Sequence, residues 1–320
     1  MKAYITPHDF PNLDQETKML AELGVELELI NSVDPKVIAE KAKDGVALFV
    51  QYTKIPQETI EQLDQCKIIL RYGIGYDNID LQAAGKKGIY VSNVPHYCGD
   101  EVADHTLAFM LTAARKLIAI NAGVHAGGWS FMQHRPIYSL ARKTLGLIGC
   151  GYIAQKVASR AKAFGMDIVA YDPWLAQDKA AAMGIELVSL EELCARADFV
   201  SLHLPLSAET YHFVNKALVA KMKDSVIIMN TARGALVNAA DMREALLDNK
   251  IGMICLDVLE TEPPEANHPL IGLEGAILTP HSAYYSEESL PALQKMAVEE
   301  VARVIRGERP LSPVNLKWWV

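Results

Sequence analysis

The chain has 320 residues, of which 31 are Lys or Arg and 39 are Asp or Glu, so its net charge is −8. An acidic surface repels phosphate backbones and anionic lipids, and we therefore expect neither nucleic acid nor a membrane as a partner. Half of the residues are hydrophobic, but no apolar run approaches the ~20 residues of a membrane-spanning helix. The length suits two globular domains with a cleft between them.

The five cysteines are scattered along the chain without a C-x-x-C pair. Four of them lie in apolar or helical stretches, so we expect buried, reduced thiols rather than disulfides or metal ligands. The first residues, MKAYI, lead directly into a strand pattern and lack the apolar segment of a secretion signal. We therefore expect a cytoplasmic protein without a bound metal.

Short apolar runs alternate with amphipathic stretches from the start of the chain. Strands are predicted at residues 2–6, 26–30, 47–50, 67–70 and 89–91, and helices at 14–23, 35–42 and 57–63. This alternation is typical of a parallel sheet covered by helices. A long helix is predicted at 101–120, and the Gly-, Trp- and His-bearing stretch 123–135 indicates a loop or short irregular structure.

A second series of the same kind begins at residue 144. Its strands are predicted at residues 145–148, 167–171, 199–202, 226–229, 253–257 and 276–279, with helices at 152–164, 177–183, 216–222 and 240–248. Six strands with interleaved helices suit a doubly wound sheet. The stretch 287–306 is again an amphipathic helix.

The segment GCGYIA at 149–154 follows the first strand of this second series. Gly149 permits a tight turn, Gly151 lets a pyrophosphate approach the backbone, and the helix opened by Tyr152 and Ile153 supplies amide donors. Asp172 ends the next strand, where an acid can bind the adenosine ribose hydroxyls and repel a 2′-phosphate. A plain glycine turn with a helix-capping Asp is the alternative. The order of strand, turn, helix, strand and acid favours NAD over NADP.

A charged or titratable residue lies just beyond the end of each of three later strands: Arg233, Glu262 and His281. Open parallel sheets bind ligands at the carboxyl ends of their strands. Reduction of a 2-keto acid by hydride needs a cation for the carboxylate, a proton donor for the carbonyl oxygen and an anion that keeps this donor protonated. Arg, His and Glu supply these functions. Each residue alone could be an ordinary loop residue, and Asp257 could be a cap, but their joint placement favours a catalytic group.

At these residues the sequence resembles the D-isomer-specific 2-hydroxyacid dehydrogenase family, and the resemblance covers nearly the whole chain. It is carried by RYGIGYDNID at 71–80, NVP at 93–95, EVADHT at 101–106, the glycine turn, HLPL at 203–206, NTARG at 230–234 and PH at 280–281. The family implies an α/β fold in which a doubly wound Rossmann NAD domain, residues 98–286, is inserted into a flavodoxin-like substrate domain, residues 1–97 plus 287–320. It also implies a homodimer built on helix 101–120, although this helix could be plain core.

The resemblance also implies the roles of the site residues. Arg233 would hold the carboxylate and keto oxygen, His281 would be the general acid/base, Glu262 would pair with it, and Asp257 would lie near the nicotinamide carboxamide. The implied cofactor contacts are Gly149, Gly151, Tyr152, Ile153, Asp172, His203, Pro205, Thr210, Thr231, Ala232, Asp257 and His281. The implied substrate contacts are Tyr52, Gly73, Ile74, Gly75, Tyr97, Arg233, His281 and Tyr284.

Within the family the chain is most similar to the C-terminal-binding proteins, which are corepressors, and to the phosphoglycerate dehydrogenases. Residues 50–53 lack the arginine of the latter, and Tyr284 stands where the former usually have Trp. The missing arginine counts against a phosphorylated substrate, and Tyr284 means that the corepressor pocket is approximated rather than copied. The set of Arg233, Glu262 and His281 favours an NAD-dependent reductase, and Tyr52, Tyr97 and Tyr284 favour a 2-keto acid with an uncharged side chain of several heavy atoms. An NADH-sensing, corepressor-like binding protein with little turnover is the alternative.

Overall fold

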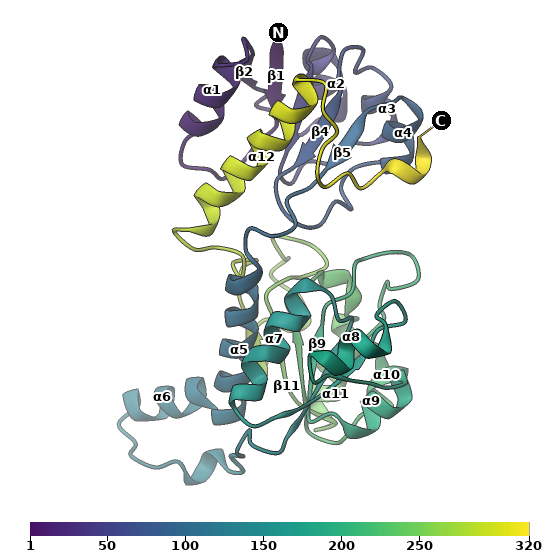
Figure 1. Ribbon diagram of the computed structural model, residues 1–320. Helices are drawn as coiled ribbons and strands as arrows, with labels where there is room; N and C mark the ends of the chain where they lie inside the picture. Colours follow the sequence, from purple (N-terminus) through teal and green to yellow (C-terminus); the bar gives the residue numbers. More distant parts are fainter. Residues whose placement is uncertain (320) are drawn as a thin grey trace. The chain divides into compact units, whose positions relative to one another are not determined.

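The structure is a computed structural model that describes residues 1–319 and divides them into two compact units. Unit 1 comprises Met1–Cys98 together with the chain from Tyr285 onward, and unit 2 is Gly99–Tyr284. The sequence predicted the breaks after residue 97 and before residue 287. Figure 1 shows unit 2 as one continuous segment inserted into unit 1.

Unit 1 is built on a parallel sheet of five strands in the order β2-β1-β3-β4-β5. The strands are β1 (Lys2–Ile5), β2 (Glu26–Leu29), β3 (Ala47–Val50), β4 (Ile68–Arg71) and β5 (Tyr90–Ser92). This is the strand order of flavodoxin-like folds. The helices are α1 (Asp14–Ala21), α2 (Pro35–Ala42), α3 (Gln57–Ile60), α4 (Leu81–Lys86) and α12 (Ser289–Ile305), with a 3-10 turn at Leu316–Trp318.

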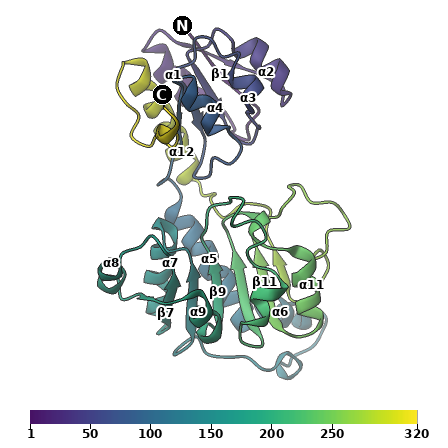
Figure 2. The ribbon, with the colours of Figure 1, turned by 90° about the vertical axis from the view of Figure 1, so that its right-hand side faces the viewer.

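The helices of unit 1 form two layers, with α1 and α12 on one face of the sheet and α2 and α3 on the other (Figure 2). On the first face, Leu293 and Val301 of α12 share a core with Ile5 and Phe49. The C-terminal segment is therefore part of this domain, because it buries apolar surface that the first 98 residues would leave exposed.

Unit 2 is built on a parallel sheet of seven strands in the order β12-β11-β10-β9-β6-β7-β8. The strands are β6 (Thr144–Ile148), β7 (Asp167–Tyr171), β8 (Glu186–Leu187), β9 (Phe199–Leu202), β10 (Val226–Asn230), β11 (Ile251–Leu256) and β12 (Ala276–Leu278). The order reverses between β6 and β9, as in the doubly wound dinucleotide-binding fold. The sequence prediction missed β8, because this edge strand has two residues and pairs only with β7.

Helices cover both faces of the second sheet. They are α5 (Gly99–Arg115), α6 (Leu117–His125), α7 (Tyr152–Ala163), α8 (Gln177–Ala182), α9 (Leu190–Arg196), α10 (Lys216–Ala220) and α11 (Ala239–Leu247), with 3-10 turns at Met132–His134 and Gly234–Leu236. One core joins α5, α7 and α8 to the sheet, and another joins α9, α10 and α11.

The predicted single helix at 101–120 is wrong in one respect, because the structure breaks it at Lys116. Lys116 has a left-handed φ of 53°, and α5 and α6 meet at a bend of 60°. The pattern of buried residues ends at Ala114, and no residue of α6 is buried, although α6 remains apolar in composition. The helix also continues to His125, into the stretch predicted as loop.

Two further expectations can be compared with the described residues. None of the five cysteines forms a disulfide; four are buried, but Cys66 is only half-buried. No single helix within residues 1–319 combines the length and apolar character needed to cross a membrane, although the bent pair of α5 and α6 meets both criteria together.

Candidate active site

The three proposed catalytic residues follow three neighbouring strands. Strands β10, β11 and β12 pair in parallel, so their carboxyl ends lie at one edge of the sheet. Arg233 comes shortly after β10, Glu262 after β11 and His281 after β12. The sheet topology therefore brings together residues that are separated by up to about 50 positions in the chain.

His281 and Glu262 form a close pair, with Nδ1 of His281 2.6 Å from Oε2 of Glu262. Burial alone would raise the pKa of Glu262, but the hydrogen bond and charge of His281, together with the charge of Arg233, hold this pKa below its ordinary value. Glu262 is therefore a carboxylate that only accepts, so Nδ1 of His281 carries the donated proton. Nε2 is left as the ring nitrogen that can serve a substrate.

The backbone on either side of this pair is fixed by hydrogen bonds. The main-chain N–H of Leu259 donates to Oε1 of Glu262 at 2.8 Å, so both carboxylate oxygens have a partner. His281 has a left-handed φ of 52°, which is strained for a residue with a side chain. Its N–H donates to the carbonyl of Asp257 at 2.7 Å, and this bond holds the strained residue against β11.

The side chain of Asp257 is almost fully buried and forms several hydrogen bonds with the loop after β12. Its Oδ1 accepts from the Thr279 hydroxyl at 2.5 Å and from the Ser282 N–H at 2.9 Å, and its Oδ2 accepts from the Ala283 N–H at 2.9 Å. These contacts support the loop that carries His281. A contact of Asp257 with the nicotinamide carboxamide remains a proposal.

The turn that carries Arg233 is held by the buried side chain of Asn230. Its Oδ1 accepts from the Ala232 N–H at 2.9 Å, and its Nδ2 donates to the Arg233 carbonyl at 2.8 Å. The next residue, Gly234, lies directly against the main chain of Leu259. A Cβ at Gly234 would lie 1.9 Å from the carbonyl carbon of Leu259, so only glycine permits this approach.

The loop that carries Glu262 is also held by a second His–Glu contact. The sequence did not predict this contact. Glu260 accepts from the Tyr211 hydroxyl at 2.6 Å and lies 3.0 Å from Nε2 of His212. Both contacts hold the pKa of Glu260 below its ordinary value. One signal in the sequence could have indicated this role, since Glu260 follows the same strand as Glu262.

The glycine turn has the geometry that a dinucleotide requires. Gly149 has a φ of +85°, and a Cβ there would lie 2.8 Å from the carbonyl oxygen of His203. A Cβ at Gly151 would meet no atom within 4 Å, so the backbone is open to a ligand before α7 begins at Tyr152. Ala154 is fully buried and packs the helix on the sheet. The residues present therefore fit NAD, whose pyrophosphate the first amides of α7 would hold.

The structure shows how the side chain of Asp172 is held, while its binding of a ribose stays a prediction. Its Oδ2 accepts from the Cys150 N–H and its Oδ1 from the Trp174 N–H, each at 2.8 Å. These bonds tie Asp172 to the glycine turn and to the turn that follows it, and the side chain caps neither α7 nor α8, so the helix-cap alternative is wrong. The Leu175 N–H also donates to Oδ1, at 3.2 Å. A carboxylate has about four acceptor positions, so one is left for a ribose hydroxyl.

The remaining proposed cofactor residues lie on loops of unit 2. Ser201 Oγ lies 2.9 Å from Nε2 of His203, and burial lowers the pKa of His203 to about 4, so this ring is neutral at neutral pH. The Thr210 hydroxyl donates to the Pro205 carbonyl at 2.8 Å. Thr231 precedes Ala232 in the turn after β10.

The proposed substrate residues are divided between the two units. Arg233, His281 and Tyr284 belong to unit 2, where the rings of His281 and Tyr284 lie edge to face with centroids 6.1 Å apart. Tyr52, Gly73, Ile74, Gly75 and Tyr97 belong to unit 1. There the loop at 73–75 is shaped by Asn93, whose Nδ2 donates to the Ile74 carbonyl at 2.6 Å, and by the positive φ of Gly73.

The contact of Gly234 with Leu259 generates a stability prediction. Gly234→Ala must push the two loops apart, and we expect this overpacking to cost about 1–3 kcal/mol, which lowers Tm by several degrees in a thermal melt. Gly123→Ala, in α6, is the control, because its Cβ would lie at an ordinary contact distance of 3.4 Å from Nε2 of His134. Equal Tm values for the two variants would show that the loops separate without cost.

Comparison with known proteins identifies the family. Residues 107–283 match the family model described as D-isomer specific 2-hydroxyacid dehydrogenase, NAD binding domain. The chain is 41% identical over 308 residues to D-3-phosphoglycerate dehydrogenase of Methanocaldococcus jannaschii, covering 96% of this chain and 58% of that protein. It is 39% identical over 284 residues to glyoxylate reductase of Korarchaeum cryptofilum, covering 88% and 86%.

A solved structure gives the same answer. D-lactate dehydrogenase from Aquifex aeolicus, complexed with NAD and lactic acid, superposes with a TM-score of 0.85 at 30% identity, covering 99% of this chain and 97% of that one. This chain thus spans less than two thirds of the phosphoglycerate dehydrogenase but most of the other two proteins. The predicted two-domain α/β fold and NAD cofactor are confirmed, and the chain belongs to the D-isomer specific 2-hydroxyacid dehydrogenase family.

Proposed function

We propose that this chain is an NAD-dependent dehydrogenase that reduces a 2-keto acid to a D-2-hydroxy acid. The observation that carries the proposal is the His281–Glu262 pair at 2.6 Å. These two residues follow β12 and β11, and β11 pairs with β10, the strand that precedes Arg233. Family membership supports the same reaction class.

Each residue has a distinct part in the proposed reaction. The guanidinium of Arg233 binds the substrate carboxylate and the keto oxygen, which orients the carbonyl. Nε2 of His281 donates a proton to that oxygen, and Glu262 stabilises the imidazolium from the Nδ1 side. NADH, when bound, supplies the hydride that the carbonyl carbon accepts. In the reverse direction His281 takes the proton back from the hydroxyl.

An NADH-sensing binding protein is the second candidate function. Such a protein needs only the glycine turn and Asp172. The coupled His281 and Glu262 add a proton-transfer group that sensing does not require, so we infer turnover rather than sensing.

We further propose an uncharged substrate side chain of several heavy atoms. Tyr284 lies beside the His281 ring, and Tyr52 and Tyr97 are proposed substrate contacts from unit 1. Aromatic side chains favour apolar groups, whereas a phosphate without a cationic partner would be desolvated at a cost. The loop at 50–53 supplies no arginine.

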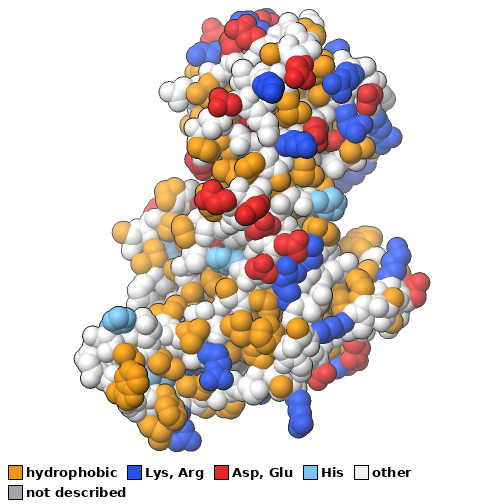
Figure 3. All heavy atoms as spheres, turned by 60° about the vertical axis from the view of Figure 1, so that its left-hand side comes forward, with side chains coloured by type: hydrophobic (Ala, Val, Ile, Leu, Met, Phe, Trp, Pro, Cys, Tyr) orange, Lys and Arg blue, Asp and Glu red, His pale blue; other side chains and the backbone are white. Residues whose placement is uncertain are grey.

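We propose a homodimer in the cytoplasm. The exposed arm that follows α5 supports the dimer, because Leu117, Ile118, Trp129, Phe131 and Met132 are all more than half exposed. Apolar patches of this kind mark protein interfaces. Figure 3 shows hydrophobic side chains gathered on the surface of unit 2. The buried residues of α5 pack in the core of unit 2. The exposed segment from Leu117 to Met132 is therefore a better candidate for the dimer interface than α5. The free cysteines support a reducing compartment.

The function is tested by NADH consumption with a panel of keto acids: pyruvate, glyoxylate, 4-methyl-2-oxopentanoate, 4-methylthio-2-oxobutyrate and phosphohydroxypyruvate. We expect the branched and thioether acids to exceed pyruvate in kcat/KM by about 10- to 100-fold, with a D product, and Tyr284→Ala to reduce this preference. If glyoxylate or phosphohydroxypyruvate leads, the proposed side-chain class is wrong. If no acid is reduced, the proposed activity is wrong.

Asp172 predicts the choice of cofactor. We expect kcat/KM for NADH to exceed that for NADPH by at least ~100-fold, because the carboxylate repels a 2′-phosphate. Asp172→Ser should narrow the ratio, whereas Asp178→Ser, on the exposed first turn of α8, should leave it unchanged. Equal use of both cofactors by the unchanged chain would contradict the assignment.

The His281–Glu262 pair predicts the pH dependence. Reduction should fall as pH rises, because the protonated imidazole that donates is lost. The lowered pKa of Glu262 keeps its carboxylate ionised throughout this range, where it favours the imidazolium. In Glu262→Gln the fall should therefore occur at lower pH, while in Glu191→Gln, an exposed surface change, it should not move. Superimposable kcat/KM profiles for the unchanged chain and Glu262→Gln would remove Glu262 from this role.

A further inference from the structure

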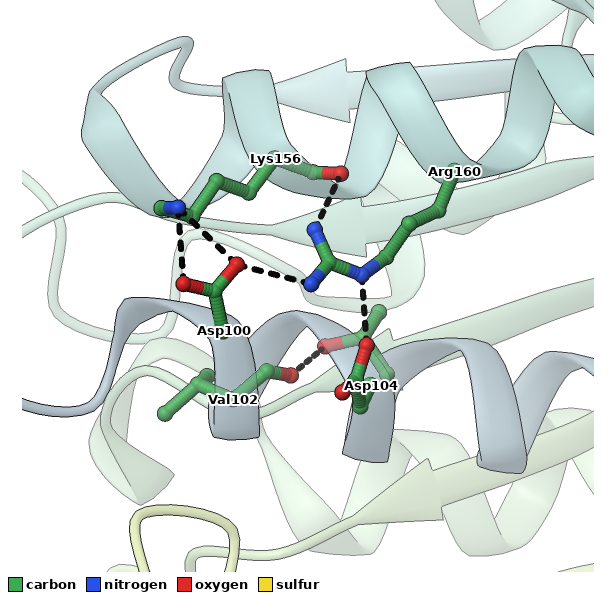
Figure 4. Close-up of polar contacts among 6 residues, drawn as sticks. Asp100, Val102, Asp104, Lys156 and Arg160 are labelled. Atoms are coloured by element: carbon green, nitrogen blue, oxygen red, sulfur yellow. Dashed lines mark hydrogen bonds and ion pairs between the residues drawn. The ribbon is translucent and has the colours of Figure 1, made fainter. Parts of the chain in front are cut away.

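The proposed function makes no use of the segment EVADHT at residues 101–106, which lies in the first turns of α5. This end of α5 is fastened to α7, the helix that follows the glycine turn (Figure 4). Asp100 accepts from Lys156 at 2.9 Å and from Arg160 at 2.8 Å, and Asp104 accepts from Arg160 at 2.5 Å. Two consecutive residues, His105 and Thr106, then contact the loops of the proposed active site.

His105 begins a chain of hydrogen bonds that ends at a buried carboxylate. Nε2 of His105 lies 3.0 Å from the hydroxyl of Thr279, which lies 2.5 Å from Oδ1 of Asp257. The Asp257 oxygens accept from two main-chain N–H groups as well, so the Thr279 hydroxyl uses its single hydrogen to donate to Asp257. Thr279 can then only accept from His105. Nε2 of His105 is therefore a donor.

The carboxylate at the end of this chain controls the backbone around His281. Asp257 binds Thr279 on one side of His281 and the N–H groups of Ser282 and Ala283 on the other. His281 itself is in the left-handed region, which costs free energy and persists only where the surrounding bonds impose it. The bond from His105 fixes the Thr279 hydroxyl in the orientation that serves Asp257.

The His105 ring also has an aromatic neighbour. It meets Phe109 edge to face, with ring centroids 4.5 Å apart. The neighbouring Thr106 hydroxyl lies 3.2 Å from that of Thr231, two residues before Arg233. One turn of α5 thus contacts the segments that carry both His281 and Arg233.

We propose that His105 is a positioning residue for His281. It donates through Thr279 to Asp257 and thereby stabilises the backbone conformation in which His281 pairs with Glu262. His105 does not contact the reacting atoms in this proposal, which rests on the proposed function of His281 as acid/base.

The test compares two substitutions of His105 with a control at its ring partner. His105→Leu removes the donor, and we expect kcat to fall at least tenfold while KM for the keto acid and the Kd for NADH stay within twofold. His105→Gln places an amide donor near the position of Nε2 and should restore at least a third of kcat. Phe109→Leu, which loses packing but no donor, should lower Tm and keep kcat within twofold.

Two kinetic outcomes would overturn the proposal. One is an unchanged kcat in His105→Leu. The other is a loss of kcat in His105→Leu that His105→Gln does not restore and that Phe109→Leu shows as well, when Phe109→Leu and His105→Leu have the same Tm. That result would show that His105 acts only through packing.

A readout that does not depend on turnover separates this proposal from the proposed function. The imidazole NMR signals of His281 can be assigned in the full chain with NAD by their loss in His281→Asn. In His105→Leu these signals should shift or broaden, and in His105→Gln they should match the unchanged chain. Unchanged His281 signals in His105→Leu would overturn the positioning role. If the unchanged chain reduces no keto acid, the proposed function fails, and the NMR comparison still decides whether His105 positions His281.

Discussion

The parallel pairing of β10, β11 and β12 is the constraint on which the proposed active site depends. Consecutive parallel strands end at one edge of the sheet, so the loops that follow them have to share a small region. These loops are tied to one another mainly through the backbone. Asp257 holds the loop of His281, Asn230 holds the turn of Arg233, and Gly234 lets that turn rest on Leu259. The separation of His281 and Glu262 is thus set largely by main-chain geometry.

The electrostatics of the site follow from this arrangement. Glu262 is partly desolvated, which by itself would favour its neutral form, yet the hydrogen bond of His281 and the charge of Arg233 outweigh that effect. A bound 2-keto acid brings a second carboxylate, which Arg233 can pair with bidentate geometry. The site would then contain two cations and two anions when the imidazole is protonated. This balance lets a proton donor persist beside a substrate anion.

The sequence was sufficient to predict the features of the fold that depend on the local pattern of residues. Alternating apolar runs located most strands, and the glycine turn with Asp172 located the dinucleotide fold. It could not reveal β8, whose two residues carry no periodicity, nor the break at Lys116, because α6 stays apolar after burial has ended. It also missed the bonds of His105 to Thr279 and of Tyr211 to Glu260. These partners are 174 and 49 residues apart, and no local spacing encodes such contacts.

The two acidic residues at strand ends show why structural and functional readings of one residue need not compete. The sequence offered a capping role and a ligand role for Asp172 and for Asp257, and in the structure both carboxylates accept main-chain N–H groups. These bonds fix the orientation of each carboxylate before any ligand arrives. Binding of a ribose hydroxyl to Asp172, or ordering of a loop by Asp257, then costs less conformational entropy, because the carboxylate side chain is already fixed. These main-chain bonds are therefore part of what would make both residues effective in the proposed reaction.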